Sequence, residues 1–163
     1  MQKEILKLAD GVATLLKESN QTIGIAESSS GGLISAHLLA IPGASKYFIG
    51  GSVIYTRVAQ RGLLKVKEEQ MEGLRASTEE YASLNAKTIR ETLETTWGLS
   101  ETGATGPTGN RYGDSAGHSC IGISGPISRS ITIETGADQR EQNMIDFTKG
   151  ALEFLMDCLE ECR

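Results

Sequence analysis

The chain has 163 residues, of which 39% are apolar, the usual size of one domain and enough to bury a sizeable core. Its net charge is −5, with acidic and basic residues interspersed, so it has no basic stripe that could neutralise a nucleic-acid backbone. It contains no apolar run of about 18 residues, the length a membrane-spanning helix needs, and it starts with no signal-peptide pattern. We therefore expect one soluble, cytoplasmic domain over residues 1–163 that binds neither nucleic acid nor membranes.

The three cysteines are Cys120, Cys158 and Cys162. Cys120 falls within an apolar run, which places it in the predicted core, and the other two are one helical turn apart near the end of the chain. Because no second ligand cluster accompanies them, reduced thiols are favoured over a disulfide or a metal site.

The first part of the chain alternates helical and strand patterns. Apolar residues recur at three- and four-residue spacing over residues 4–17, which predicts an amphipathic helix. A β-branched run at residues 22–26, a polar glycine-rich turn and an apolar stretch from Leu33 predict a strand, a turn and a helix. After a break at residues 42–45, residues 47–55 favour a second strand, and a polar helical stretch follows.

The second part ends in a predicted hairpin. A hydroxyl cap at Ser77 or Thr78, followed by acidic residues, predicts a helix that continues to Thr96. Residues 97–101 favour a third strand, and a glycine-dense loop follows at residues 102–116.

Two more strands, at residues 118–124 and 128–135, are separated by Gly125-Pro126, a typical hairpin turn. The last helix is expected at residues 138–159. Since helices and strands alternate early and the hairpin comes late, the sequence predicts a three-layer α/β/α domain with a mixed, mostly parallel sheet.

Two glycine-rich segments each follow a predicted strand. The first, residues 28–32, offers three serine hydroxyls and two glycines that would let a ligand approach the backbone, although an ordinary helix capped by serines explains it as well. The second, residues 103–109, would lie at the same sheet edge if the two strands run parallel. Long loops of this kind are usually functional or disordered. We therefore expect the Ser28 hydroxyl to open into a pocket that both segments form.

Five motifs resemble, in order, those of the competence/damage-inducible CinA C-terminal family. They are Ala26-Glu27-Ser28-Ser29-Ser30-Gly31-Gly32, Pro42-Gly43-Ala44-Ser45, Val53-Ile54-Tyr55-Thr56, Gly103-Ala104-Thr105-Gly106-Pro107-Thr108-Gly109 and Gly136-Ala137-Asp138-Gln139-Arg140. Each motif alone is weak evidence for the family, but together they span nearly the whole chain and are strong evidence. The resemblance implies a homo-oligomeric amidase that hydrolyses nicotinamide mononucleotide to nicotinic acid mononucleotide and ammonia, without a metal or an organic cofactor.

The resemblance also implies roles for particular residues. Ser28 matches the nucleophile and Tyr55 matches its tyrosine partner, a coherent pair because a serine needs a neighbour to take its proton. For Arg140, pairing with a ligand phosphate and a solvated position at a helix start are equal alternatives. The candidate substrate-binding residues are Ser30, Gly31, Gly32, Gly103, Thr105, Gly106 and Arg140.

One position departs from the family pattern in a way that bears on catalysis. The family's lysine, five residues beyond the tyrosine, falls on Gln60, and a carboxamide has no accessible proton-accepting form. Loss of one general base costs roughly 10²–10⁴-fold in rate. The family's Lys-Pro-Val-Gly is also altered, to Asp114-Ser115-Ala116-Gly117.

Two hypotheses follow from this departure. In the first, the chain is an amidase acting through Ser28 and Tyr55, with Arg61 or His118 compensating for the missing lysine. In the second, it is a nucleotide-binding or regulatory protein that retains the pocket with little or no catalysis. His118 is a better candidate for a replacement base than His37, which we expect on a helix surface, although a structural role for His118 is also open.

Overall fold

A five-stranded sheet forms the centre of the protein, which a computed structural model describes over residues 1–163. The helices are α1 (Lys3–Glu18), α2 (Leu33–Leu39), α3 (Arg57–Ala59), α4 (Glu79–Thr92) and α5 (Arg140–Glu161). The strands are β1 (Ile23–Glu27), β2 (Phe48–Val53), β3 (Trp97–Ala104), β4 (His118–Ser124) and β5 (Arg129–Glu134). Short 3₁₀- or π-helical turns occupy Ala44–Lys46, Gln60–Leu64 and Glu68–Met71.

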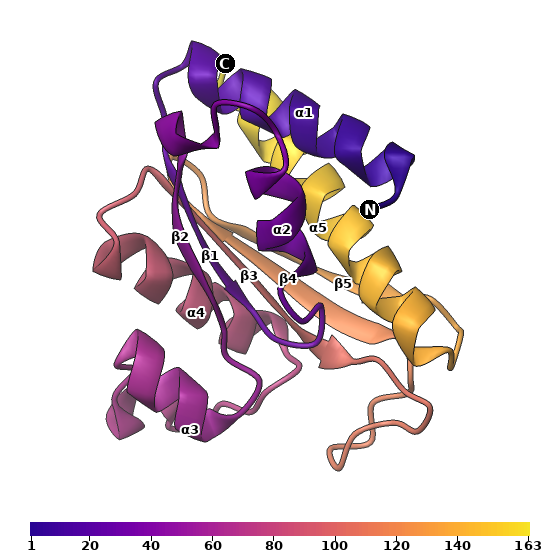
Figure 1. The fold of residues 1–163 in the computed structure, drawn as a ribbon. Helices are drawn as coiled ribbons and strands as arrows, with labels where there is room; N and C mark the ends of the chain where they lie inside the picture. Colours follow the sequence, from indigo (N-terminus) through magenta and orange to yellow (C-terminus); the bar gives the residue numbers. More distant parts are fainter.

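Helices cover both faces of the sheet. Helices α1, α2 and α5 pack together on one face, and α4 lies on the other against β3 and β4 (Figure 1). The α1 helix turns Ile5, Val12 and Leu16 into the core, as its apolar spacing predicts. The predicted three-layer α/β/α architecture is confirmed.

The sheet is mixed as predicted, but it is parallel in only two of its four strand pairs rather than in most of them. Its order is β2-β1-β3-β4-β5, and β1 pairs in parallel with β2 and β3, whereas the β3–β4 and β4–β5 pairs are antiparallel. Because a tight hairpin can join only antiparallel strands, the hairpin between β4 and β5 makes this pair antiparallel. The connection from β3 to β4 contains no crossover helix, so the chain returns beside the strand it has just left.

Several predicted boundaries shift in the structure. Strand β3 continues to Ala104, three residues beyond the prediction, because it pairs with β4 along its whole length, from Gly98↔Ser124 to Ala104↔His118. Gly103 therefore lies in a strand and not in the loop. Helix α4 ends at Thr92 rather than Thr96, and its N-cap is Thr78, whose hydroxyl accepts a hydrogen bond from the Tyr81 N–H at 3.3 Å.

Two glycines allow α4 to lie close to the sheet. A Cβ at Gly98 or Gly122 would overlap the backbone of Ala86 or Ala82, respectively. The three cysteines are free thiols, and Cys120 is buried as predicted. No helix of the chain has the length and apolar character needed to cross a membrane.

Candidate active site

A cavity of about 580 Å³ lies where the two glycine-rich segments meet. Strands β1 and β3 run parallel as neighbours, so their carboxyl ends lie at the same edge of the sheet. The cavity is lined by the turn after β1, the end of β3, the segment after β2 and the loop before β4, with Ser28, Tyr55, Gly103, Asn110, Arg111 and Tyr112 among its residues. Of the second glycine-rich segment, only Gly103, near the end of β3, lines this cavity together with Ser28.

A buried glutamate holds the turn after β1. Glu101, on β3, is fully buried, and its Oε2 accepts hydrogen bonds from the N–H groups of Ser28 at 3.1 Å and Ser30 at 2.8 Å. The hydroxyls of Ser29, Ser30 and Ser119 also donate to this carboxylate. These donors compensate for burying the charge. Glu101 therefore fixes the turn that carries Ser28.

A second buried glutamate, Glu27 at the end of β1, anchors the start of α2. Its carboxylate accepts hydrogen bonds from the N–H groups of Ile34 and Ser35 and from the Ser35 hydroxyl, at 2.7–3.1 Å. The Ser30 hydroxyl lies between the two carboxylates, 2.7 Å from Glu27 Oε2 and 2.9 Å from Glu101 Oε2. Ser30 is fully buried, so its hydroxyl supports the turn from within and does not face the cavity.

Ser28 differs from its two neighbours. Its hydroxyl makes no hydrogen bond within the chain, whereas those of Ser29 and Ser30 are both bonded to carboxylates. The turn also leaves the N–H groups of Ser29 and Gly32 without a partner in the chain. Gly31 and Gly32 have φ values of +67° and +98°, in the left-handed region that glycine adopts without strain. The turn thus presents one free hydroxyl and free N–H donors.

Arg140 connects Tyr55 with the second glycine-rich segment. From the first turn of α5, its Nη2 donates to the Tyr55 hydroxyl at 3.2 Å and its Nη1 donates to the Gly106 carbonyl at 2.7 Å. Asn143, one turn further along α5, donates to the Thr105 carbonyl at 2.9 Å. Arg140 thus lies beside the site through Tyr55, outside the cavity lining, and Thr105 and Gly106 are buried against α5.

Gln60, at the position of the family's lysine, does not line the cavity. Its side chain is buried, with a residue exposure of 1%, and its Nε2 donates to Asn85 Oδ1 at 2.8 Å. The neighbouring Arg61 is exposed and also lies outside the lining.

Neither histidine lines the cavity, although His118 contacts the lining residue Ser77. The ring nitrogens of His118 are hydrogen-bonded to Glu134 and to the Ser77 carbonyl, so neither is available to accept the Ser28 proton. Burial opposes the charged form of His118, but hydrogen bonds to these two acceptors and the charge of Asp114 raise its pKa. His37 is buried between α1 and α5 with Nδ1 2.7 Å from the Leu33 carbonyl, so the expectation of a surface position was wrong.

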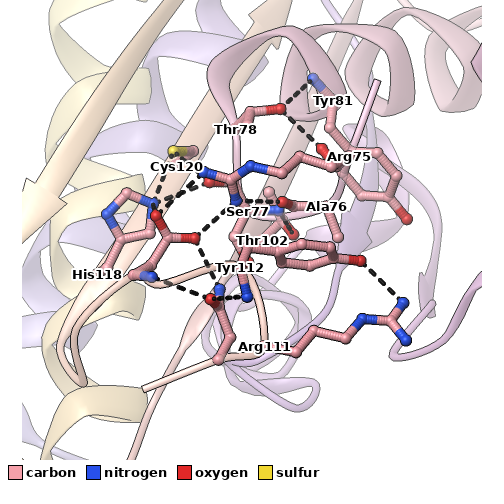
Figure 2. A network of polar contacts seen from close by, with 12 residues as sticks. Arg75, Ala76, Ser77, Thr78, Tyr81, Thr102, Arg111, Tyr112, His118 and Cys120 are labelled. Carbon is pink, nitrogen blue, oxygen red and sulfur yellow. Dashed lines mark hydrogen bonds and ion pairs between the residues drawn. The ribbon is translucent and has the colours of Figure 1, made fainter. Parts of the chain in front are cut away.

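A polar network holds the loop before β4 (Figure 2). Arg75 makes a two-pronged ion pair with Asp114, at 2.7 and 3.1 Å, and Asn110 Nδ2 donates to the same carboxylate at 2.7 Å. The hydrogen bond from Arg75 lowers the pKa of Asp114, despite the opposing effect of its burial. The guanidinium carbons of Arg75 and Arg111 both lie 5.0 Å from the centre of the Tyr112 ring.

Two groups of residues that support or line the site were not predicted from the sequence. Glu27 directly follows the strand predicted at residues 22–26, and Glu101 is the last residue of the strand predicted at residues 97–101. An acid at the end of an apolar strand is a usable signal, because a buried carboxylate needs dedicated partners. Arg111 and Tyr112 follow the glycine-rich motif in a loop, and no local pattern distinguishes them from other surface residues.

The comparisons with known proteins agree with this fold. The family model described as the CinA C-terminal domain matches residues 5–159. A CinA-like protein of Nostoc sp. is 41% identical over 119 residues, which cover 73% of this chain and 28% of the relative. A CinA-like protein of Gloeobacter violaceus is 36% identical over 151 residues, which cover 91% of this chain and 35% of the relative. The chain thus spans about a third of the length of these curated relatives.

Solved structures of related proteins have the same fold. The competence/damage inducible protein CihA from Agrobacterium tumefaciens is 25% identical, with a TM-score of 0.89 and 98% of both chains covered. The competence damage-inducible protein A from Klebsiella pneumoniae has a TM-score of 0.91 at 22% identity, with 98% of this chain and 99% of that chain covered, which is a likeness of fold.

Proposed function

Because this chain belongs to the CinA C-terminal domain family, we propose that it is a serine amidase that hydrolyses nicotinamide mononucleotide to nicotinic acid mononucleotide and ammonia. One observation carries the proposal. Ser28 alone among the three turn serines has a hydroxyl without a partner in the chain, and it faces a cavity that can hold a small molecule.

The chemistry follows from this arrangement. The Ser28 Oγ attacks the carboxamide carbon of the substrate. The N–H groups of Ser29 and Gly32 have no partner in the chain and are our candidates for stabilising the developing oxyanion, although neither residue lines the cavity. Tyr55 lines the same cavity, and its hydroxyl accepts from Arg140. Its own proton moves to the departing nitrogen, and its oxygen takes the Ser28 proton in exchange. Ammonia leaves, and water then hydrolyses the acyl-serine.

A second function, nucleotide binding with little turnover, is favoured by Gln60. Nothing on the cavity wall replaces the family's lysine as a neutral base: the wall's cations are Arg57 and Arg111, and arginine stays protonated. We therefore expect slow hydrolysis by the native chain.

The experiment that separates these functions measures ammonia release from nicotinamide mononucleotide. The panel is the native chain, Ser28→Ala, Gln60→Lys and the double variant. We expect slow release by the native chain, none from Ser28→Ala, and a gain for Gln60→Lys that stays below the roughly 10²–10⁴-fold effect of a complete general base. The gain requires the longer lysine side chain to reach the cavity, since residue 60 lies outside the lining. Burial of this position lowers the pKa of a lysine and so favours its neutral form.

Two outcomes would contradict the proposal. Release that persists in the double variant would remove Ser28 as the nucleophile. No release from any variant, with nucleotide binding retained by the native chain, would leave the binding function in place of the amidase.

A further inference from the structure

The wall of the cavity carries a cation, Arg111, that the mechanism above does not use. We propose that Arg111 determines specificity by binding the anionic group of the substrate, a phosphate, and that Arg75 and Asp114 are the positioning residues that hold this wall in place. The identity of the nucleotide rests on the proposed function, whereas the anion site rests on the contacts described below.

Charge pairing distinguishes Arg111 from the other arginines around the cavity, except Arg140, which lies outside the lining and donates to the Gly106 carbonyl and the Tyr55 hydroxyl. Arg57 pairs with Glu68 at 3.1 Å, and Arg75 pairs with Asp114. Arg111 has no carboxylate partner, although the chain contains 21 acidic residues and has a net charge of −5. Its only side-chain hydrogen bond is from Nη2 to the Tyr112 hydroxyl, at 2.9 Å. An exposed guanidinium at a cavity, with most of its donors free, is suited to a two-pronged contact with phosphate.

The network in Figure 2 explains how an exposed loop can hold such a residue in place. The ion pair between Arg75 and Asp114 anchors the loop, and the Arg75 guanidinium packs against the Tyr112 ring, 5.0 Å from its centre. Tyr112 in turn accepts the hydrogen bond from Arg111. Neither Arg75 nor Asp114 lines the cavity, so both act on a ligand only through Arg111 and Tyr112.

The remaining lining indicates the class of ligand. Three tyrosines, Tyr55, Tyr81 and Tyr112, line the cavity together with Arg111. Aromatic side chains offer surfaces on which a planar ring can stack, and the guanidinium offers a site for an anion. The cavity therefore fits a ligand that joins a planar heterocycle to a phosphate, with the reacting amide near Ser28.

The test compares two ligands that differ only in the phosphate. Nicotinamide mononucleotide and nicotinamide riboside are titrated calorimetrically into the Ser28→Ala chain, which cannot turn them over, and into the same chain carrying Arg111→Gln, Arg111→Lys or Asp114→Asn. The matched control is Arg163→Gln, which removes the same charge from an exposed residue at the end of the chain.

We expect the mononucleotide to bind about 10- to 100-fold more tightly than the riboside, because a hydrogen-bonded charge pair contributes about that factor. Arg111→Gln should abolish most of this preference, Arg111→Lys should retain part of it, and Arg163→Gln should leave it unchanged. Asp114→Asn should weaken binding of the mononucleotide but not of the riboside, a selectivity that general loosening of the fold would not produce.

An unchanged preference in Arg111→Gln would overturn the inference, even if the native chain hydrolyses the mononucleotide. If neither pyridine compound binds, inorganic phosphate is titrated as the probe. Binding of phosphate that Arg111→Gln abolishes would then support the anion site while removing the proposed substrate. Absence of phosphate binding would overturn the anion site as well.

Discussion

Two segments contribute residues to the same cavity and are held by different interactions. The turn of residues 28–32 is fastened by two fully buried glutamates, Glu27 and Glu101, whose hydrogen bonds come from backbone N–H groups and serine hydroxyls. The loop of residues 105–117 is fastened by an ion pair that remains partly open to water, with side-chain exposures of 39% for Arg75 and 13% for Asp114.

The two kinds of contact differ in how much stability is lost when a residue is substituted. A buried carboxylate cannot lose its donors without leaving an uncompensated charge or dipole in the interior, which costs several kcal/mol. A solvent-accessible ion pair contributes about 1 kcal/mol or less. The turn therefore holds Ser28 firmly. Substitutions in the loop are expected to cost little stability.

The largest effect is expected from Glu101→Gln. The amide nitrogen of glutamine would face N–H and hydroxyl groups that now donate to the carboxylate, so donors would oppose donors in a dry site. We expect the free energy of unfolding to fall by about 3 kcal/mol or more. Urea denaturation measures it. Glu4→Gln, which removes an exposed partner of Lys149, is the control and should change stability by less than about 0.5 kcal/mol.

A smaller effect is expected from Asp114→Asn, which leaves Arg75 without its charged partner. Because this pair is partly solvated, we expect the free energy of unfolding, measured by urea denaturation, to fall by about 1 kcal/mol. A loss as large as that of Glu101→Gln would show that the loop is as tightly fixed as the turn, and the contrast between the two segments would fail.

Much of the fold could be predicted because its signals are local. Apolar spacing identified α1 and α5, the pair Gly125-Pro126 identified the hairpin, and strand β4 was predicted with its observed bounds, His118–Ser124. The error in sheet direction has a non-local cause, since the direction of β4 depends on what the connection after β3 contains. The ends of α4 and β3 were also set by tertiary pairing rather than by propensity.

The candidate site was predictable in part for the same reason. A glycine-rich turn after a strand is visible in the sequence, and Ser28 and Tyr55 do line one cavity. The glutamate that holds the turn could not be assigned, because the bonds from Ser28 and Ser30 to Glu101 span 73 and 71 residues. The burial of His37 likewise depends on α1 and α5 closing over α2, which no pattern within α2 reveals.

The smallest expected difference between the two segments is in how pH affects the free energy of unfolding. The turn contains no histidine, whereas the loop ends at His118, which faces Glu134, Asp114, the Ser77 carbonyl and Cys120. Desolvation would lower the pKa of His118, but the hydrogen bonds to Glu134 and Ser77 and the charge of Asp114 raise it above its ordinary value. A histidine whose pKa is raised on folding binds its proton more tightly in the folded state than in the unfolded state.

The sign of the effect follows from this tighter binding. The stabilisation is fully present below the unfolded pKa of about 6.5 and is lost as the pH rises through the folded pKa. We therefore expect the free energy of unfolding of the native chain to fall relative to that of His118→Gln as the pH rises from about 5.5 to about 8.5. Glutamine can still donate to one of the two acceptors but cannot titrate, so the difference between the two curves isolates the histidine. Parallel curves for the two proteins would show that His118 keeps the same pKa on folding, and a difference that grows with pH would show that its pKa is lowered.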